Sequence, residues 1–306
     1  MTATSIPLEQ QLSRLSLNQQ TIPRWSLPEL VDGCARAGLP AVGLWREPVA
    51  QYGLTRTARL VEAAGLRVSS LCRGGFFTSE EPDRWYTAID DNLRAIDEAA
   101  ALRAECLVLV VGGMGPESTD LTGARMRVQE ALSLLAPAAR EHGVRLALEA
   151  LHPMFCADRS VLSTLRQALQ IAGTAEATLA PDQGPDQGLD QGPDQALDQA
   201  KPTVGVVVDA YHVWWDPDLR AAIMDAGPRI LSFQVCDWVL PLPADVLLGR
   251  GMVGDGHIDL RALRAAVDSA GYRGDIEVEI FNQAIWDTDP DAVLGTVVKR
   301  YLEHVF

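Results

Sequence analysis

Short apolar runs alternate with longer amphipathic segments along most of the chain, and this alternation is the main signal of its fold. In the amphipathic segments the apolar residues recur at helical spacing, as at Leu162, Leu165, Leu169 and Ala172. Eight apolar runs predict strands: Leu15–Gln19, Ala41–Trp45, Arg67–Leu71, Cys106–Val111, Arg145–Glu149, Val204–Asp209, Ile230–Val235 and Asp275–Ile280. The chain is therefore expected to alternate strand and helix from end to end.

Such alternation predicts a parallel sheet covered by helices, because parallel neighbours need long crossover connections. Eight units fit a closed (β/α)8 TIM barrel, with residues 1–306 as a single domain. An open, doubly wound sheet is the alternative, but no glycine-rich fingerprint follows the first strand. The GxGxxG pattern at Gly249–Gly254 follows a proline-rich loop, which favours a flexible loop over a dinucleotide site.

A tetrapeptide repeat interrupts this pattern between the fifth and sixth predicted strands. From Pro181 to Ala200 the chain reads PDQGPDQGLDQGPDQALDQA, which combines turn-forming residues with almost nothing apolar. Such a segment cannot offset the entropy of ordering, so residues 181–200 are expected to form a low-complexity, disordered insert. Calcium binding is the alternative, although the spacing differs from known Asp-rich calcium loops.

Composition and charge narrow the class of protein. Of 306 residues 47% are hydrophobic, and 26 basic against 41 acidic residues give a net charge of −15, which disfavours nucleic acid as a partner. No apolar run approaches the ~18–20 residues of a membrane span, and the start of the chain lacks secretory features, so a cytoplasmic protein is expected. The five cysteines are scattered without a C-x-x-C pair, which predicts reduced thiols. A homo-oligomer is possible, because neither composition nor charge decides the oligomeric state.

Polar residues collect at the carboxyl ends of the later predicted strands, where barrel enzymes carry their active sites. Alternate residues of a strand face opposite sides of the sheet, and the apolar residues of these strands are expected to face outward, towards the helices. The residues between them then face into the barrel: Glu149, Asp209, Gln234, Glu277 and Glu279. Clustered carboxylates repel unless a cation neutralises them, so a divalent metal is expected, with oxygen ligands favouring Mn²⁺, Mg²⁺ or Co²⁺. Structural ion pairs are the alternative, with three candidate partners: Arg73, Arg145 and Arg250.

The order of these motifs resembles the sugar phosphate isomerase/epimerase family of xylose isomerase-like barrels, which includes ketose 3-epimerases and inosose dehydratase. The resemblance rests on Glu149, Asp209-x-x-His212, the GDGHID motif at Gly254–Asp259, and Glu279 within VEIF. It spans nearly the whole chain, and two earlier segments contribute to it: SLNQQT at 16–21 and LCRGGFF at 71–77.

The resemblance implies one metal ion held by four residues: Glu149, Asp209, Gln234 and Glu279. It also implies that His212 and Arg250 contact the substrate. Many relatives carry His where this chain has Gln234, and an amide oxygen is a harder, weaker ligand than imidazole. Two further histidines near the predicted mouth, His152 and His257, are candidate substrate contacts, and Arg73 faces inward by parity and is a candidate for a substrate carboxylate or phosphate.

The expected function is metal-dependent isomerisation or epimerisation of a keto sugar or related polyol through an enediolate, with Glu149 and Glu279 as acid and base. A lyase or dehydratase would use the same intermediate and expel a β-substituent. A non-catalytic sugar-binding barrel is the alternative from another class. An apurinic endonuclease is disfavoured, because no histidine precedes His142 and the chain is acidic.

Overall fold

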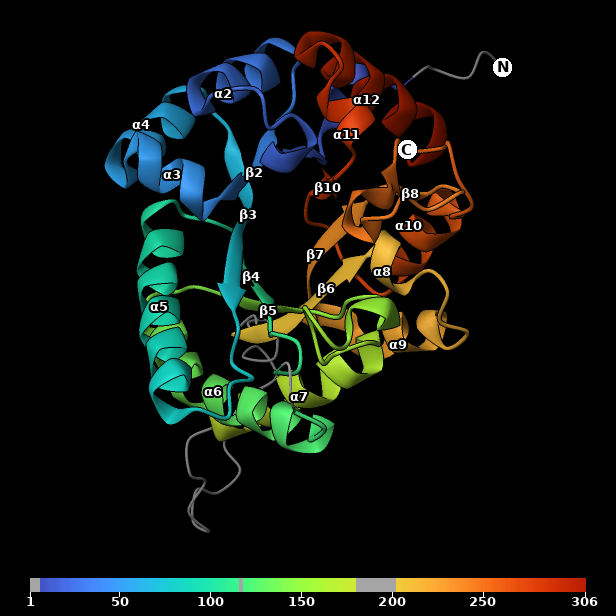
Figure 1. Cartoon of the computed structure of the whole chain (residues 1–306). Coiled ribbons are helices and arrows are strands. Elements are labelled where there is room, and N and C mark those ends of the chain that lie inside the picture. Colours follow the sequence, from blue (N-terminus) through green and yellow to red (C-terminus); the bar gives the residue numbers. More distant parts are fainter. Residues whose placement is uncertain (1–5, 116–117, 180–201) are drawn as a thin grey trace, which may run out of the picture.

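Eight parallel strands close into a barrel in the computed structural model, which describes residues 6–115, 118–179 and 202–306 (Figure 1). Around the barrel the strand order is β1-β10-β7-β6-β5-β4-β3-β2. Their bounds are β1 Leu15–Asn18, β2 Ala41–Trp45, β3 Arg67–Gly75, β4 Leu107–Val110, β5 Leu146–Glu149, β6 Val204–Asp209, β7 Ile230–Val235 and β10 Ile276–Val278. This confirms the (β/α)8 prediction; the repeat at 181–200 lies outside the described residues.

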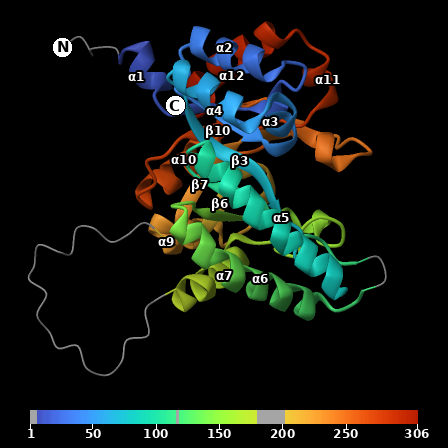
Figure 2. The ribbon, with the colours of Figure 1, turned by 90° about the vertical axis from the view of Figure 1, so that its left-hand side faces the viewer.

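Helices surround the strands, and the longer helices bury an apolar face against them. The longer ones are α2 Leu27–Arg36, α4 Leu54–Ala63, α5 Pro82–Ala101, α6 Leu121–Glu141, α7 Leu165–Thr178, α9 Leu219–Ala226, α10 Leu260–Ser269 and α12 Pro290–His304. The shorter ones are α1 Leu8–Leu12, α3 Arg46–Tyr52, α8 Ala210–Val213 and α11 Gln283–Trp286. Figure 2 shows α5, α6 and α7 side by side along the barrel. No described helix has the length and apolar character needed to cross a membrane.

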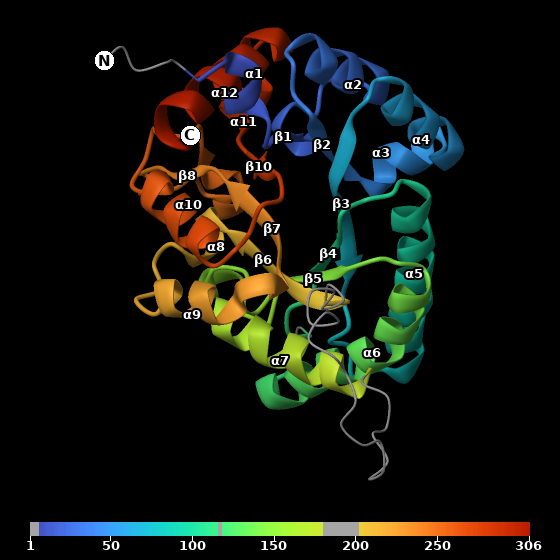
Figure 3. The same cartoon turned by 180° about the vertical axis from the view of Figure 1, so that it is seen from behind.

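The first and last strands of the barrel, β1 and β10, lie side by side and pair in parallel, which closes the barrel (Figure 3). Local signals mark the helix ends: Ser26 and Glu29 form a capping box at the start of α2, and Gly143 follows α6 with φ +67°. All five cysteines are free. The main core lies between the strands and the helices, and a smaller apolar cluster fills the barrel interior.

Strict alternation predicts a wrong facing on the seventh strand. Strict alternation along the seventh strand places Leu231 outward with Phe233, but Leu231 packs inside the barrel with Val207 and Ala147. A register shift between β6 and β7 pairs Val206 with Ile230 and the next residue, Val207, with Ser232. The irregularity adds one residue on β7 and turns Leu231 inward, and alternation resumes after it, so the facing of Gln234 is unaffected.

Candidate active site

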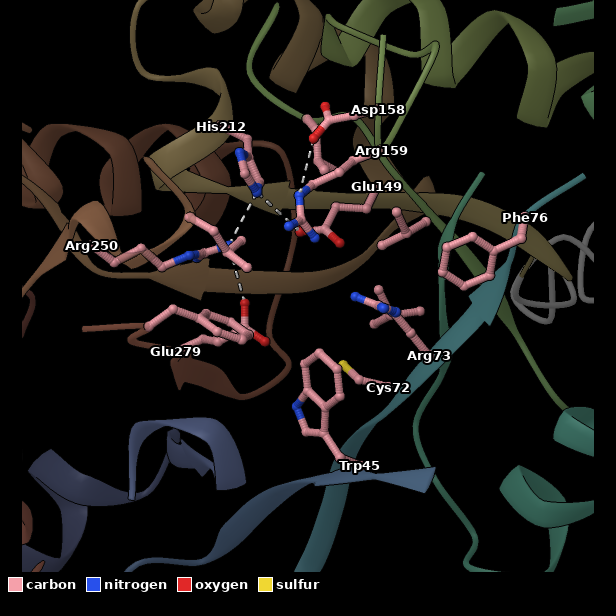
Figure 4. A pocket seen from close by; sticks show the side chains of 15 residues that line it. Trp45, Cys72, Arg73, Phe76, Glu149, Asp158, Arg159, His212, Arg250 and Glu279 are labelled. Carbon is pink, nitrogen blue, oxygen red and sulfur yellow. Dashed lines mark hydrogen bonds and ion pairs between the residues drawn. The ribbon is translucent and has the colours of Figure 1, made fainter. Parts of the chain in front are cut away.

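A cavity of about 250 Å³ opens at the carboxyl ends of the barrel strands (Figure 4). Its wall includes Trp45 and Glu149, the last residues of β2 and β5, together with Glu279 just after β10. Positive charge comes from three arginines on different parts of the fold: Arg73 in β3, Arg159 in the loop before α7, and Arg250 in β9. This volume suits a small molecule.

Glu149, Asp209 and His212 form the acidic and imidazole centre of the site. One potential ligand atom from each lies within 4.8 Å of the others, and all three side chains are buried. Their spacing follows from the fold, because Asp209 ends β6 beside β5, and His212 lies one helical turn later in α8. Burial, with the neighbouring charges of Asp209 and Glu279, holds the pKa of Glu149 well above its ordinary value.

Arg250 ties the two sides of this centre together. Its Nη1 donates to Oδ2 of Asp209 at 2.8 Å, and its Nη2 lies 3.3 Å from Oε2 of Glu279 and 3.1 Å from Nε2 of His212. Burial raises the pKa of Asp209, but the charge of Arg250, with the hydrogen bonds from Arg250 and the backbone N–H of Tyr211, contributes to a larger opposite shift, so this pKa lies below its ordinary value. Burial also raises the pKa of Glu279 to about 8, although Arg250 opposes this shift. Arg250 therefore neutralises part of the buried negative charge.

A two-stranded ribbon places Arg250 at this point. Strands β8 Asp237–Trp238 and β9 Arg250–Gly251 pair antiparallel after β7. The Asp237 carboxylate accepts hydrogen bonds from the backbone N–H groups of Gly254 and Ile258, each at 3.0 Å. The glycine-rich GDGHID turn thus braces the ribbon that carries Arg250.

His212 is a neutral, firmly held imidazole. Its Nδ1 accepts a 3.2 Å hydrogen bond from the backbone N–H of His152. Its ring also meets the rings of Phe155 and Tyr211 edge-on, with centroids 5.7 and 5.4 Å away. Burial lowers its pKa to about 3, so the ring carries no charge at neutral pH.

Gln234 lies beneath the cavity between two carboxylates. In strand register it faces Asp209 on β6 and Glu277 on β10. Its Nε2 donates to Oε1 of Glu277 at 3.2 Å, while its buried Oε1 has no hydrogen-bond partner among the described residues. A buried carbonyl oxygen without a partner is costly, so this atom is a strong candidate for a ligand to a cation.

The donor set fits a hard divalent metal ion. The ligand atoms of Glu149 and Asp209 lie close together beside His212. Glu279, which Arg250 links to Asp209, would add a third carboxylate, and Gln234 would add its unpartnered amide oxygen. Three neighbouring carboxylates with a neutral oxygen donor are the ligands that Mg²⁺ and Mn²⁺ prefer. The guanidinium of Arg250 shares two of these carboxylates, so an ion here would be bound beside a fixed positive charge.

The structure brings together most of the residues predicted from the sequence: Glu149, Asp209, Gln234, Glu279, His212 and Arg250. His152 stands behind them, because its backbone orients His212 while its ring packs on Trp215 and Trp238. His257 is exposed on the surface and does not line the cavity.

Sequence reasoning missed Arg159, which lines the cavity from an irregular loop. No strand periodicity extends to that loop, so only the fold could bring it to the site. Arg73, in contrast, was a candidate from the sequence, and it does line the cavity. Strict alternation does not explain its position, because Leu71 packs in the outer core while Cys72 faces the barrel interior, and an irregularity interrupts β3 between Leu71 and Gly74.

Comparisons with known proteins agree with this architecture. A family model described as xylose isomerase-like TIM barrel matches residues 31–178 and 157–300. A crystal structure of a protein from Sinorhizobium meliloti 1021 superposes with a TM-score of 0.85 at 43% identity, covering 96% of this chain and 99% of the other. The crystal structure of the IolI protein with a bound zinc atom has a TM-score of 0.76 at 19% identity, covering 95% of this chain and 98% of the other.

A curated relative from Pseudomonas putida KT2440 is a 3-dehydroshikimate dehydratase, 26% identical over 264 residues. The match covers 84% of this chain and 36% of the relative, so the chain spans about a third of that protein's length.

Proposed function

Because the chain belongs to the xylose isomerase-like TIM barrel family, we propose that its cavity is the active site of a dehydratase acting on a small polyhydroxylated ketone. The enzyme removes a proton from the carbon next to the carbonyl group and expels a hydroxyl group as water. One observation carries the proposal: the carboxyl groups of Glu149 and Glu279 line the same cavity from strands that β6 and β7 separate.

The two glutamates divide the proton transfers between them. One carboxylate accepts the proton from the carbon next to the carbonyl group, and the electron pair of that C–H bond moves into an enolate. The other carboxyl group donates its proton to the leaving hydroxyl as the C–O bond breaks, so one molecule of water leaves. Exchange with solvent restores both glutamates. Neutral His212 and the fixed charge of Arg250 orient the oxygen atoms of the substrate.

A divalent cation completes this proposal. Glu149, Asp209, Gln234 and Glu279 would hold it, and when bound it would polarise the carbonyl oxygen and lower the cost of the enolate. The unpartnered amide oxygen of Gln234 supports this ligand set. The zinc atom in the IolI structure supports a metal in a barrel of the same fold. Mg²⁺, Mn²⁺ and Co²⁺ are the ions to test first.

We favour dehydration over the epimerisation that the sequence resemblance implied. The curated relative that matches 84% of the chain is a 3-dehydroshikimate dehydratase. The compound in that name is a six-membered cyclic ketone that bears hydroxyl groups. Epimerisation is the second candidate, since two carboxyl groups on separate strands can remove and return a proton on opposite faces of a substrate.

Incubation of the metal-loaded protein with 3-dehydroshikimate tests the first candidate. We expect the ultraviolet absorbance of 3,4-dihydroxybenzoate to rise, and a chelator to abolish the rise until metal is restored. The absence of aromatic product would contradict dehydration of this substrate. Deuterium uptake from heavy water into an intact ketohexose would favour the epimerase, and tight metal binding without turnover of any keto substrate would favour a sugar-binding barrel.

A further inference from the structure

Arg73 brings an unmatched positive charge to the cavity. It forms neither an ion pair nor a side-chain hydrogen bond with any residue that the structure describes, whereas Arg250 contacts two carboxylates. Its guanidinium lies over the ring of Trp45 at 5.5 Å and over the ring of Phe76 at 5.1 Å. These aromatic faces restrict the guanidinium without satisfying its N–H donors.

Arg159 provides a second under-used guanidinium on the same cavity (Figure 4). Its Nε is buried and has no hydrogen-bond partner among the described residues. Its ion pair with Asp158 spans 3.6 Å between side chains that are 32% and 63% exposed, so solvent weakens it. Phe155 supports the guanidinium from one side, with 5.8 Å between the ring centroid and Cζ.

We propose that Arg73 and Arg159 together form a subsite for a carboxylate group on the substrate. Guanidinium groups bind carboxylates through paired N–H donors, and both arginines have donors to spare. The net charge of the chain is −15, so unmatched positive charge in this cavity requires a specific explanation. The inference rests on the proposed function, because it defines which hydroxylated ketones that site accepts.

A carboxylate fits this subsite better than a phosphate group does. Glu149, Glu279 and Asp158 also line the cavity, so a dianion would meet more repulsion than a monoanion. The cavity volume of about 250 Å³ is small, so a substrate ring in the cavity leaves little room for an additional phosphate group. The expected substrate is therefore a small hydroxylated ketone with one carboxylate.

Two probes that differ only in the carboxylate test this subsite without requiring turnover. Calorimetry of the metal-loaded protein would compare 3,4-dihydroxybenzoate with catechol, which shares the diol. We expect a preference of roughly 10- to 100-fold for the carboxylate probe, as charge-assisted hydrogen bonds give. Arg73→Met and Arg159→Met should each remove most of this preference and leave catechol binding within about twofold. Arg73→Lys should retain part of it.

Arg103→Met is the matched control, because Arg103 is 85% exposed and lies outside this cavity. It also loses one positive charge, and it should keep the full preference. Circular dichroism would establish that each variant is folded. Equal binding of the two probes by the unmodified protein would overturn the inference, as would a preference that survives both methionine substitutions.

Competition distinguishes the two kinds of anion. Stronger displacement of 3,4-dihydroxybenzoate by inorganic phosphate than by benzoate would assign the subsite to phosphate and overturn the carboxylate proposal. The outcome is also separable from that of the proposed function. A carboxylate preference without any dehydration would contradict only the dehydratase, whereas dehydration without the preference would contradict only the subsite.

Discussion

The side-chain amide of Gln234 is oriented by Glu277, to which its Nε2 donates a 3.2 Å hydrogen bond. The carboxylate of Glu277 is itself fixed by hydrogen bonds from Asn18, Ser69 and Ser70. A β-carbon at position 43 would stand only 2.6 Å from this carboxylate, so Gly43 provides the room for it. Because the Nε2 side of the amide faces Glu277, the amide oxygen remains available as a ligand.

Glu277→Gln should weaken metal binding although Glu277 is not itself expected to touch the ion. The new amide would compete for hydrogen bonds and release the fixed orientation of Gln234. We expect roughly a 10- to 100-fold loss of Mn²⁺ affinity, typical of residues that orient a ligand. Titration calorimetry would measure it, with Glu105→Gln on the opposite end of the barrel as control. Unchanged Mn²⁺ affinity would contradict the orienting role.

Substitution of Gln234 tests its place among the ligands directly. Imidazole binds transition metals more strongly than an amide oxygen, so Gln234→His should tighten Mn²⁺ or Co²⁺ binding. Gln234→Ala should weaken it, because it removes the unpartnered oxygen atom. Elemental analysis after dialysis against limiting metal would rank the three proteins. Equal metal content in all of them would exclude residue 234 from the ligand set.

The two glutamates should be individually indispensable for turnover. Glu149→Gln and Glu279→Gln each remove a proton carrier and a negative charge from the ligand set, so we expect turnover to fall by roughly 10²- to 10⁴-fold or more. Steady-state kinetics on the substrate established by the dehydration assay would measure this loss. Full activity in either variant would refute the division of proton transfers. Product isolated from heavy water would also separate dehydration from epimerisation.

His212 should make stability depend on pH in a defined direction. Its pKa is lowered to about 3 in the folded protein, while an unfolded chain has a histidine pKa of about 6.5. The unfolded state therefore binds more protons below pH 6.5, and folding stability falls as pH falls, by about 1.4 kcal/mol per pH unit. Above pH 6.5 this contribution is fully present.

Chemical denaturation between pH 7.5 and 5 in the presence of a chelator would test this sign. The unmodified protein should lose more stability over that interval than His212→Asn does, because asparagine has no group to titrate. Parallel losses in the two proteins would show that burial does not keep the His212 ring neutral.

Much of the fold and half of the site follow from the sequence alone. Side chains alternate along a strand, and the strand ends meet at one face of a barrel. The apolar pattern was therefore enough to predict that Glu149, Asp209 and Gln234 face inward. The register shift that turns Leu231 into the barrel depends on the pairing of β6 with β7, which no periodicity within one strand records.

Tertiary structure alone decided what surrounds those strand ends. Loops have no repeating spacing, so the sequence could not show that Arg159 reaches the cavity while His257 remains exposed. Motif order named Arg250, but only folding showed that it contacts both Asp209 and Glu279. These contacts join residues that are distant in the chain, and their geometry depends on how the β8–β9 ribbon packs over the barrel. Electrostatic interactions require proximity in space and not in sequence, so the sequence pattern could not show them.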